Sequence, residues 1–140
     1  MKIKQDQDQL WIALERGEEI AACLAKVAKD LGIGSGWVLG IGVAENLELG
    51  FYEPNTTLYQ RQTFAGSWEI LALTGNLTLD QGAPRVHLHG SFSGEDFKVI
   101  GGHFFKGHIA GAGEFWISPG EGPISRKFDP QLNLKLWDLA

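Results

Sequence analysis

The chain has 140 residues, of which 44% are hydrophobic and 21% charged, a composition that excludes a disordered protein and predicts one domain over residues 1–140. The net charge of −5 and the scattered Lys and Arg residues argue against direct nucleic-acid binding. No apolar run is long enough to span a membrane, and the polar N-terminus does not resemble a signal peptide. With a lone cysteine, Cys23, the sequence predicts a soluble cytoplasmic protein with no membrane partner.

The first half of the chain predicts a strand and then a helix. Residues 9–15 (QLWIALE) form the expected strand. Glu18 and Glu19 suit the first turn of a helix, where the helix dipole favours negative charge. Apolar residues then recur at helical spacing, and Gly32 is a natural stop; the stripe consists of Ile20, Leu24, Val27 and Leu31. We expect this to be the single long helix of the chain and to cover one face of a sheet.

The rest of the chain predicts β-structure. Strands are expected over 37–43, 47–52, 58–64, 68–79, 109–117 and 132–139. Turns or loops separate them, at Glu45-Asn46, at 53–55, after Gly66, at 80–82 and over 118–123. The predicted fold class is therefore α+β, a mostly antiparallel sheet of about seven strands covered by one long N-terminal helix.

Three of the four histidines lie in one predicted β-hairpin, residues 84–105 (PRVHLHGSFSGEDFKVIGGHFF). His87 and His89 are two residues apart, so their side chains leave the same face of a strand. A three-residue loop over 94–96 would place His103 directly opposite His87, and Gly101 opposite His89. Opposed Cβ atoms lie about 5 Å apart. Three histidines so placed predict a divalent metal site with an open fourth position.

Other chemically capable residues have simpler interpretations. His108 starts the next strand and is expected to be an ordinary turn or surface residue, and Cys23 a small residue on the buried or boundary face of the helix. The five tryptophans are expected in the core and at subunit interfaces; they are Trp11, Trp37, Trp68, Trp116 and Trp137. A cupin barrel is a rival fold, because His87-x-His89 is followed by Glu95. The spacing to Glu95 differs from the cupin pattern, however, and no histidine follows Pro119-Gly120, as that pattern would require.

Several segments in combination resemble the plant and prokaryote conserved (PPC) domain. They are the Gly17-Glu18-Glu19 start of the helix, residues 66–76 (GSWEILALTGN), 82–89 (GAPRVHLH) and 101–103 (GGH). The resemblance spans nearly the whole chain. It departs from the family at 111–114, where Gly111-Ala112-Gly113 precedes Glu114 without the usual threonine, and the AT-hook of plant members is absent.

The resemblance implies a homotrimer and a metal, zinc in many prokaryotic members, held by residues corresponding to His87, His89 and His103. Glu69 and Glu114 match glutamates of the family pattern, and a structural or interfacial role is expected for them in preference to catalysis. No catalytic residue is predicted, and whether the protein is an enzyme stays open. The favoured function is a stand-alone PPC protein with a three-histidine, zinc-like site. The alternative is a protein-interaction or DNA-associated regulatory module without catalytic activity.

Overall fold

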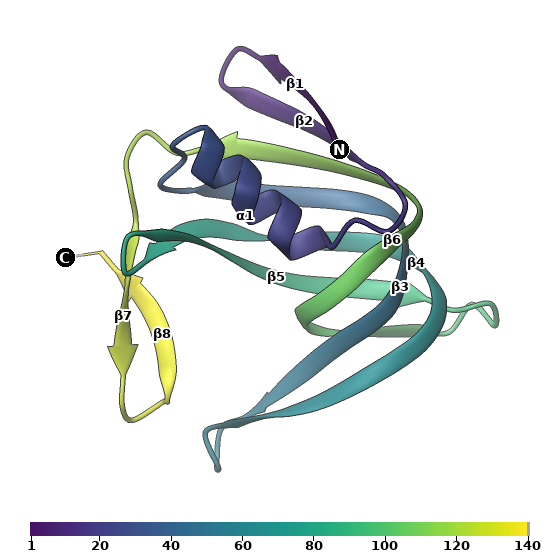
Figure 1. Cartoon of the computed structure of the whole chain (residues 1–140). Helices are drawn as coiled ribbons and strands as arrows, with labels where there is room; N and C mark the ends of the chain where they lie inside the picture. Colours follow the sequence, from purple (N-terminus) through teal and green to yellow (C-terminus); the bar gives the residue numbers. More distant parts are fainter. Residues whose placement is uncertain (140) are drawn as a thin grey trace.

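The computed structural model describes residues 1–139, which form one helix and eight strands (Figure 1). The elements in chain order are β1 (Lys2–Asp6), β2 (Gln9–Leu14), α1 (Ile20–Asp30), β3 (Gly36–Glu53), β4 (Leu58–Asp80), β5 (Ala83–Ser93), β6 (Val99–Pro119), β7 (Ser125–Asp129) and β8 (Leu134–Asp138). The predicted fold class, α+β with a long covering helix, is wrong: 68% of the chain is strand and 8% is helix. The helix has 11 residues and cannot cover an eight-stranded sheet.

The sheet is antiparallel except for one parallel bridge between Leu79 and Ser125, and its strands follow the order β1-β2-β6-β3-β4-β7-β8. β5 pairs with both β4 and β6. The long strand β6 pairs with β5 near its start, with β2 near its end and with β3 along most of its length. The sheet therefore curls, and distant segments come together around β6 (Figure 1).

The helix forms where the apolar periodicity predicts it, but it is shorter and begins later than its acidic residues suggested. Glu19 is the N-cap, and its carboxylate accepts hydrogen bonds from the backbone N–H groups of Ala21 and Ala22. Glu18 precedes the helix and bonds to the N-terminal ammonium. Leu31, which was expected in the buried apolar stripe, is instead the C-cap and is half exposed. The fourth buried residue of the helix is Ala28.

Two turns expected in the middle of the chain are β-bulges within longer strands. At Glu45-Asn46 the chain continues as β3, and the register with β4 shifts between Glu45 and Leu47. Asn46 has a φ of 55° and Gly66, on the facing strand, has a φ of 79°. Such left-handed residues accommodate the extra residue of a bulge as readily as a turn. The strands expected at 37–43 and 47–52 are one strand, as are those at 58–64 and 68–79 (Figure 1).

One hydrophobic core fills the space between α1 and the sheet face that it covers. Its helix residues are Ile20, Leu24, Val27 and Ala28, and every strand from β2 to β6 contributes to it. No tryptophan among residues 1–139 is in the buried core, so the predicted core role of the tryptophans is wrong; Trp68 packs partly buried against it. Cys23 is half buried beside the core, as expected.

Strands β1 and β7 were not predicted from the sequence, whereas β8 and the loop before β7 were. Both missed strands have five residues, few of them apolar, so their alternation gives little signal. No helix within residues 1–139 has the length and apolarity that crossing a membrane requires.

Candidate metal centre

The three histidines lie on adjacent strands, His87 and His89 on β5 and His103 on β6. The register differs from the predicted one by two residues: His89, and not His87, lies opposite His103. The connection between the strands covers residues 94–98 and is therefore longer than the expected three-residue loop. Because the difference is an even number of residues, all three side chains keep to the same face of the sheet.

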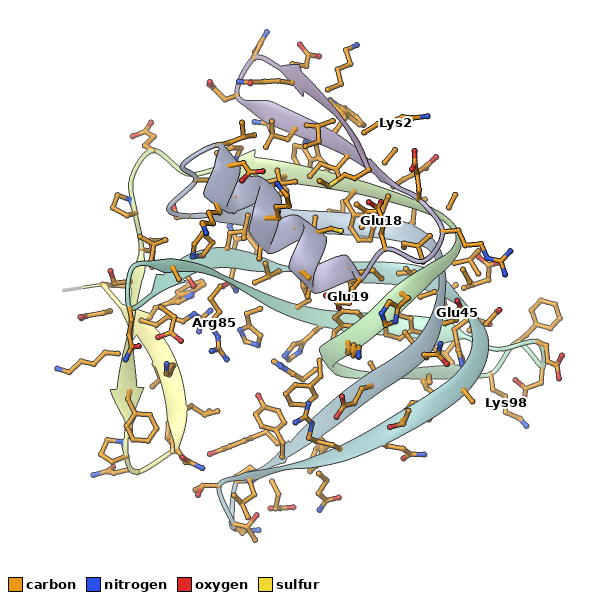
Figure 2. The ribbon with its side chains drawn as sticks, in the orientation of Figure 1. Lys2, Glu18, Glu19, Glu45, Arg85 and Lys98 are labelled. Carbon is orange, nitrogen blue, oxygen red and sulfur yellow. The ribbon has the colours of Figure 1, made fainter. Side chains whose placement is uncertain are left out.

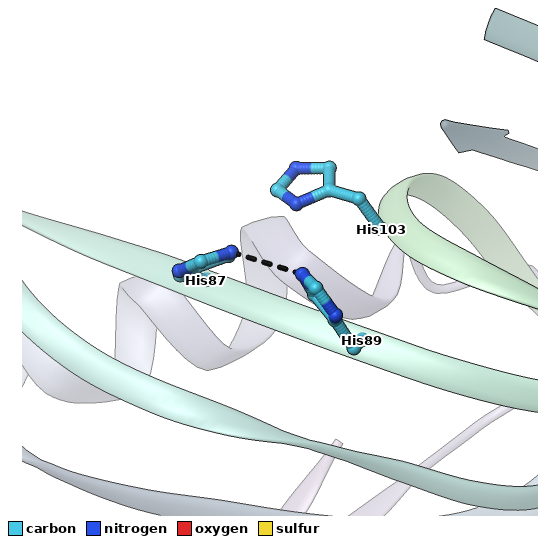
Figure 3. Close-up of side chains that lie close together, drawn as sticks. All are labelled: His87, His89 and His103. Carbon is cyan, nitrogen blue, oxygen red and sulfur yellow. Dashed lines mark hydrogen bonds between the residues drawn. The ribbon is translucent and has the colours of Figure 1, made fainter. Parts of the chain in front are cut away.

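The predicted residues come together as a compact cluster, called the histidine cluster below (Figure 3). One nitrogen of each ring lies within 4.8 Å of the others. The Nε2 atoms of His87 and His89 are 3.2 Å apart. The three ring centroids are separated by 4.9 to 5.4 Å. Leu88 between the two β5 histidines is buried in the core, so the cluster occupies the sheet face away from α1.

Aromatic rings support the cluster on the side of His103. The ring centroid of His103 is 4.5 Å from that of Phe105 and 4.9 Å from that of Tyr59. Gly50 lies opposite His103 on β3, and a Cβ there would approach Phe105 to 2.4 Å and Tyr59 to 3.0 Å. The absence of a side chain at Gly50 thus lets both rings pack beside the histidine.

Two arginines lie beside the cluster on its other side. Arg85 is two residues before His87 on β5, so its side chain leaves the same face. Figure 2 shows Arg85 on the side of β5 that faces away from α1. Arg126 of β7 donates hydrogen bonds to Thr78 Oγ1 (2.7 Å) and Asn76 Oδ1 (2.8 Å). These residues are the cross-strand neighbours of Arg85 and His87.

The ionisation of the cluster suits metal binding. Burial lowers the pKa of His87 to about 4, with further contributions from His89, Arg126 and Arg85. Burial also lowers the pKa of His103 to about 3, helped by the neighbouring histidines and by Arg85 and Arg61. Both rings are therefore neutral at pH 7, the form that coordinates metals. Nδ1 of His103 is buried and has no hydrogen-bond partner within residues 1–139. The residues present thus fit a divalent ion.

The other residues that the sequence singled out lie outside the cluster. Glu69 and Glu114 are exposed, and Glu114 instead lines an apolar hollow of about 640 Å³ formed by β1, β2, β3 and β6. His108 stands apart from the cluster, as expected, but the prediction of a turn or surface residue is wrong. It lies within β6 and is half buried, and its Nδ1 is unpartnered by any described residue. A second hollow, of about 890 Å³, lies at the C-terminal end of α1, and neither hollow is lined by the three histidines.

Sequence reasoning missed Arg85, Arg126 and Tyr59 as neighbours of the cluster. The pattern Arg85-x-His87-x-His89 contained the signal for the first, since residues two apart on a strand share a face. Arg126 and Tyr59 belong to distant strands, and no local pattern places them beside the histidines.

Comparison with known proteins identifies the class of fold. The family model described as the Plants and Prokaryotes Conserved (PCC) domain matches residues 1–119. The chain therefore belongs to this family, which is the PPC domain family that its motifs resemble. The rival cupin fold is thereby rejected. No curated protein matches significantly.

Solved structures agree with the family assignment. A candidate DNA-binding protein from Bacteroides thetaiotaomicron is 32% identical, with a TM-score of 0.94, covering 98% of this chain and 96% of that one. A PPC protein from Pyrococcus horikoshii is 28% identical, with a TM-score of 0.87 and coverages of 99% and 94%. A metal-containing protein from Archaeoglobus fulgidus is 26% identical, with a TM-score of 0.87 and coverages of 97% and 94%.

Proposed function

We propose that this PPC protein binds one divalent metal ion, zinc or a similar ion, through His87, His89 and His103. The single observation that carries the proposal is the convergence of three histidine nitrogens within 4.8 Å from two strands. The similar protein from Archaeoglobus fulgidus, described as metal-containing, supports it. A divalent ion with three histidine ligands keeps a position for a further ligand, which it polarises as a Lewis acid.

The chain's own residues would hold and shape this site. The backbone pairing of β5 and β6 fixes His89 and His103 opposite each other, and His87 follows on the same face. Tyr59 and Phe105 pack against His103 and limit access of water from that side. Because the ligands lie on paired strands and not on loops, the cluster is preorganised before the ion arrives.

Metal analysis of the purified protein is the direct test of the metal proposal. We expect about one ion per chain in the unaltered protein and none in the His87→Ala, His89→Ala, His103→Ala triple variant, because that variant lacks all three proposed ligands. His108→Ala is the matched control, since that histidine is outside the cluster, and it should keep the ion. Equal metal content in the triple variant and in the unaltered protein would refute the proposal.

We also propose that the protein is a cytoplasmic homotrimer, and the exposed apolar face supports self-association. Trp11, Leu39 and Ile41 are 57%, 49% and 52% exposed, and all three line the hollow of about 640 Å³. Lys2 and Lys4 also line it, together with Glu114. The face thus carries both charge signs around an apolar centre, the composition of a surface that contacts another copy of itself.

The alternative function is a protein-interaction or DNA-associated regulatory module. The observation in its favour is the description of the Bacteroides thetaiotaomicron protein as a candidate DNA-binding protein. The net charge of −5 opposes direct contact with DNA. Binding of a duplex that weakens steeply as salt is raised would support this alternative, whereas no binding at 50 mM salt would exclude direct recognition.

A further inference from the structure

The charge around the histidine cluster is unusual for a cation site. The cluster includes no carboxylate from residues 1–139, although Asp and Glu are common partners of metal-bound histidines. The charged groups beside it are instead cations: Arg85 and Arg126 on one side, and on the other Arg61, which lies over the Phe105 ring and pairs with Glu48. A divalent ion bound there would raise the positive charge further.

Arg126 is held in place by neutral groups, which leave its positive charge uncompensated. Its Nε, Nη1 and Nη2 atoms donate to Thr78 Oγ1, to the carbonyl of Lys135 and to Asn76 Oδ1, at 2.7 to 2.8 Å. All three acceptors are neutral, and no ion pair within residues 1–139 involves Arg126. A guanidinium has five N–H donors, so two remain for a ligand. The side chain is also half buried, which strengthens its interaction with an anion.

Arg85 adds a second positive charge. Its one close carboxylate is Asp80, at 3.2 Å, and that carboxylate also accepts from Lys135 Nζ at 2.6 and 2.7 Å. Two cations, Arg85 and Lys135, therefore share one carboxylate, and no carboxylate within residues 1–139 pairs with Arg126. The excess of positive charge lies on the same side of the sheet as the histidines, because Arg85 precedes them at i−2 and i−4 on β5.

We propose that Arg126 and Arg85 form the recognition part of an oxyanion site, so that the metal-bound protein takes a small ligand with a carboxylate or phosphate group. This inference rests on the proposed metal site and goes beyond it by naming the class of ligand. Guanidinium groups match carboxylate and phosphate oxygens with paired hydrogen bonds, and a bound ion would attract the same oxygens.

The experiment uses Co²⁺ as a visible reporter. The full-length protein is loaded with Co²⁺, the stoichiometry is measured first, and then sodium phosphate or sodium acetate is titrated while the absorption bands of the ion are recorded. We expect saturable spectral changes with at least one of the two anions. Saturation with phosphate alone would identify a phosphate ligand, and saturation with acetate alone a carboxylate.

Variants assign the anion binding to the arginines. Arg126→Gln should raise the Kd for the anion about tenfold, the effect of losing one charge-assisted interaction. The same variant should hold Co²⁺ at least as tightly, because a neighbouring cation has been removed. If the substitution instead disrupted the structure of β7, the binding of both the anion and Co²⁺ would weaken. Arg126→Lys keeps the positive charge but loses the paired N–H donors of the guanidinium, so it should give an intermediate Kd for the anion. Lys127→Gln is the control, because Lys127 is exposed and next in sequence, and it should bind the anion as the unaltered protein does.

The two proposals fail in different ways. If Co²⁺ does not bind, the metal proposal fails and this inference falls with it. If Co²⁺ binds with normal stoichiometry but neither anion changes its spectrum, the oxyanion site alone is refuted. The same holds if Arg126→Gln and Arg85→Gln bind the anions as tightly as the unaltered protein does, because the metal alone would then explain the binding.

Discussion

Gly75 illustrates how the site depends on residues that carry no chemistry. A Cβ at this position would approach the carbonyl oxygen of His87 to 1.8 Å, far inside van der Waals contact. Gly75 pairs with Leu88 on β5, between the two histidines of that strand. The close approach of β4 to β5 at this point therefore requires glycine, and it lies at the stretch of β5 that carries the two histidines.

Gly75→Ala should accordingly harm both stability and metal binding. The added methyl must push β5 away from β4, and overpacking of this kind costs about 1 to 3 kcal/mol. Urea denaturation and competition with a chelator would measure the two effects. Gly122→Ala is the control, because a Cβ at Gly122 has no neighbour within 4 Å, and it should leave both unchanged. A Gly75→Ala protein with unaltered stability would contradict the packing argument.

The sequence predicted which side chains share a face in the cluster but not their pairing. The spacing of His87 and His89 is enough to place both on one face, whatever the register. The pairing of His103 depended on loop length, and Phe97, with a φ of 60°, lies in a loop longer than the turn residues implied. Since β-strands alternate with period two, the error of two residues moved His103 along the face without turning it away.

At the scale of the elements, the turn between β4 and β5 ties the C-terminal hairpin to the sheet. Residues 81 and 82 have φ values of 52° and 81°, which form the expected tight turn. Asp80, directly before it, pairs with Arg85 of β5 and Lys135 of β8. Strands β4, β5 and β8 thus meet at one carboxylate.

This carboxylate makes stability depend on pH. The hydrogen bond from Lys135, followed by the charges of Lys135 and Arg85, lowers the pKa of Asp80 below its ordinary 3.8. The contribution of Asp80 to the free energy of unfolding is therefore present above pH 3.8 and is lost as pH falls through the folded-state pKa. Asp80→Asn should lower the free energy of unfolding by about 0.5 to 1 kcal/mol at pH 7, because the pair is partly solvated.

The difference between Asp80→Asn and the unaltered protein should shrink as pH falls toward 3, as urea denaturation at both pH values would show. Asp6→Asn on the exposed strand β1 removes the same charge without this pairing and serves as the control. A deficit that is as large at pH 3 as at pH 7 would mean that the ion pairs are not its source.

The bulges show why element boundaries were harder to predict than the elements themselves. Asn46 and Gly66 carry the backbone conformation of turns, and a local pattern cannot distinguish a chain that reverses from one that continues with a bulge. The facing strand decides, because β3 and β4 pair on both sides of the shift. Only tertiary pairing therefore reveals these strands of 18 and 23 residues.

At the scale of the whole molecule, the family was predictable and the fold class was not. The motifs around residues 66–76, 82–89 and 101–103 are specific in combination, and the family model that matches residues 1–119 confirms their interpretation. The helix gave the clearest periodic signal in the sequence, which made it seem a larger part of the fold than its 11 residues are. Short strands such as β1 and β7 gave almost none.

The apolar face formed by Trp11, Leu39 and Ile41 gives a prediction about assembly. Ile41→Glu places a charge at the centre of this face, so we expect a trimer to dissociate while each chain stays folded, because burying an unpaired charge is costly. Light scattering on a sizing column would measure the mass, and circular dichroism the fold. Phe97→Glu, at a more exposed apolar residue in the loop before β6, should stay trimeric. An unaltered Ile41→Glu mass would exclude this face.

The long strands lie inside the sheet and the short ones at its margins. β1 and β8, the two ends of the strand order, have five residues each, against 18 to 23 for β3, β4 and β6. Lys2, Lys4 and Asp6 give β1 a fully exposed, charged row, and β8 carries Lys135 and Asp138. Short, charged margins resist the open-ended strand addition that builds fibrils. The sheet margins therefore disfavour fibril growth by edge-to-edge strand addition, and they leave the apolar face as the surface for a closed oligomer.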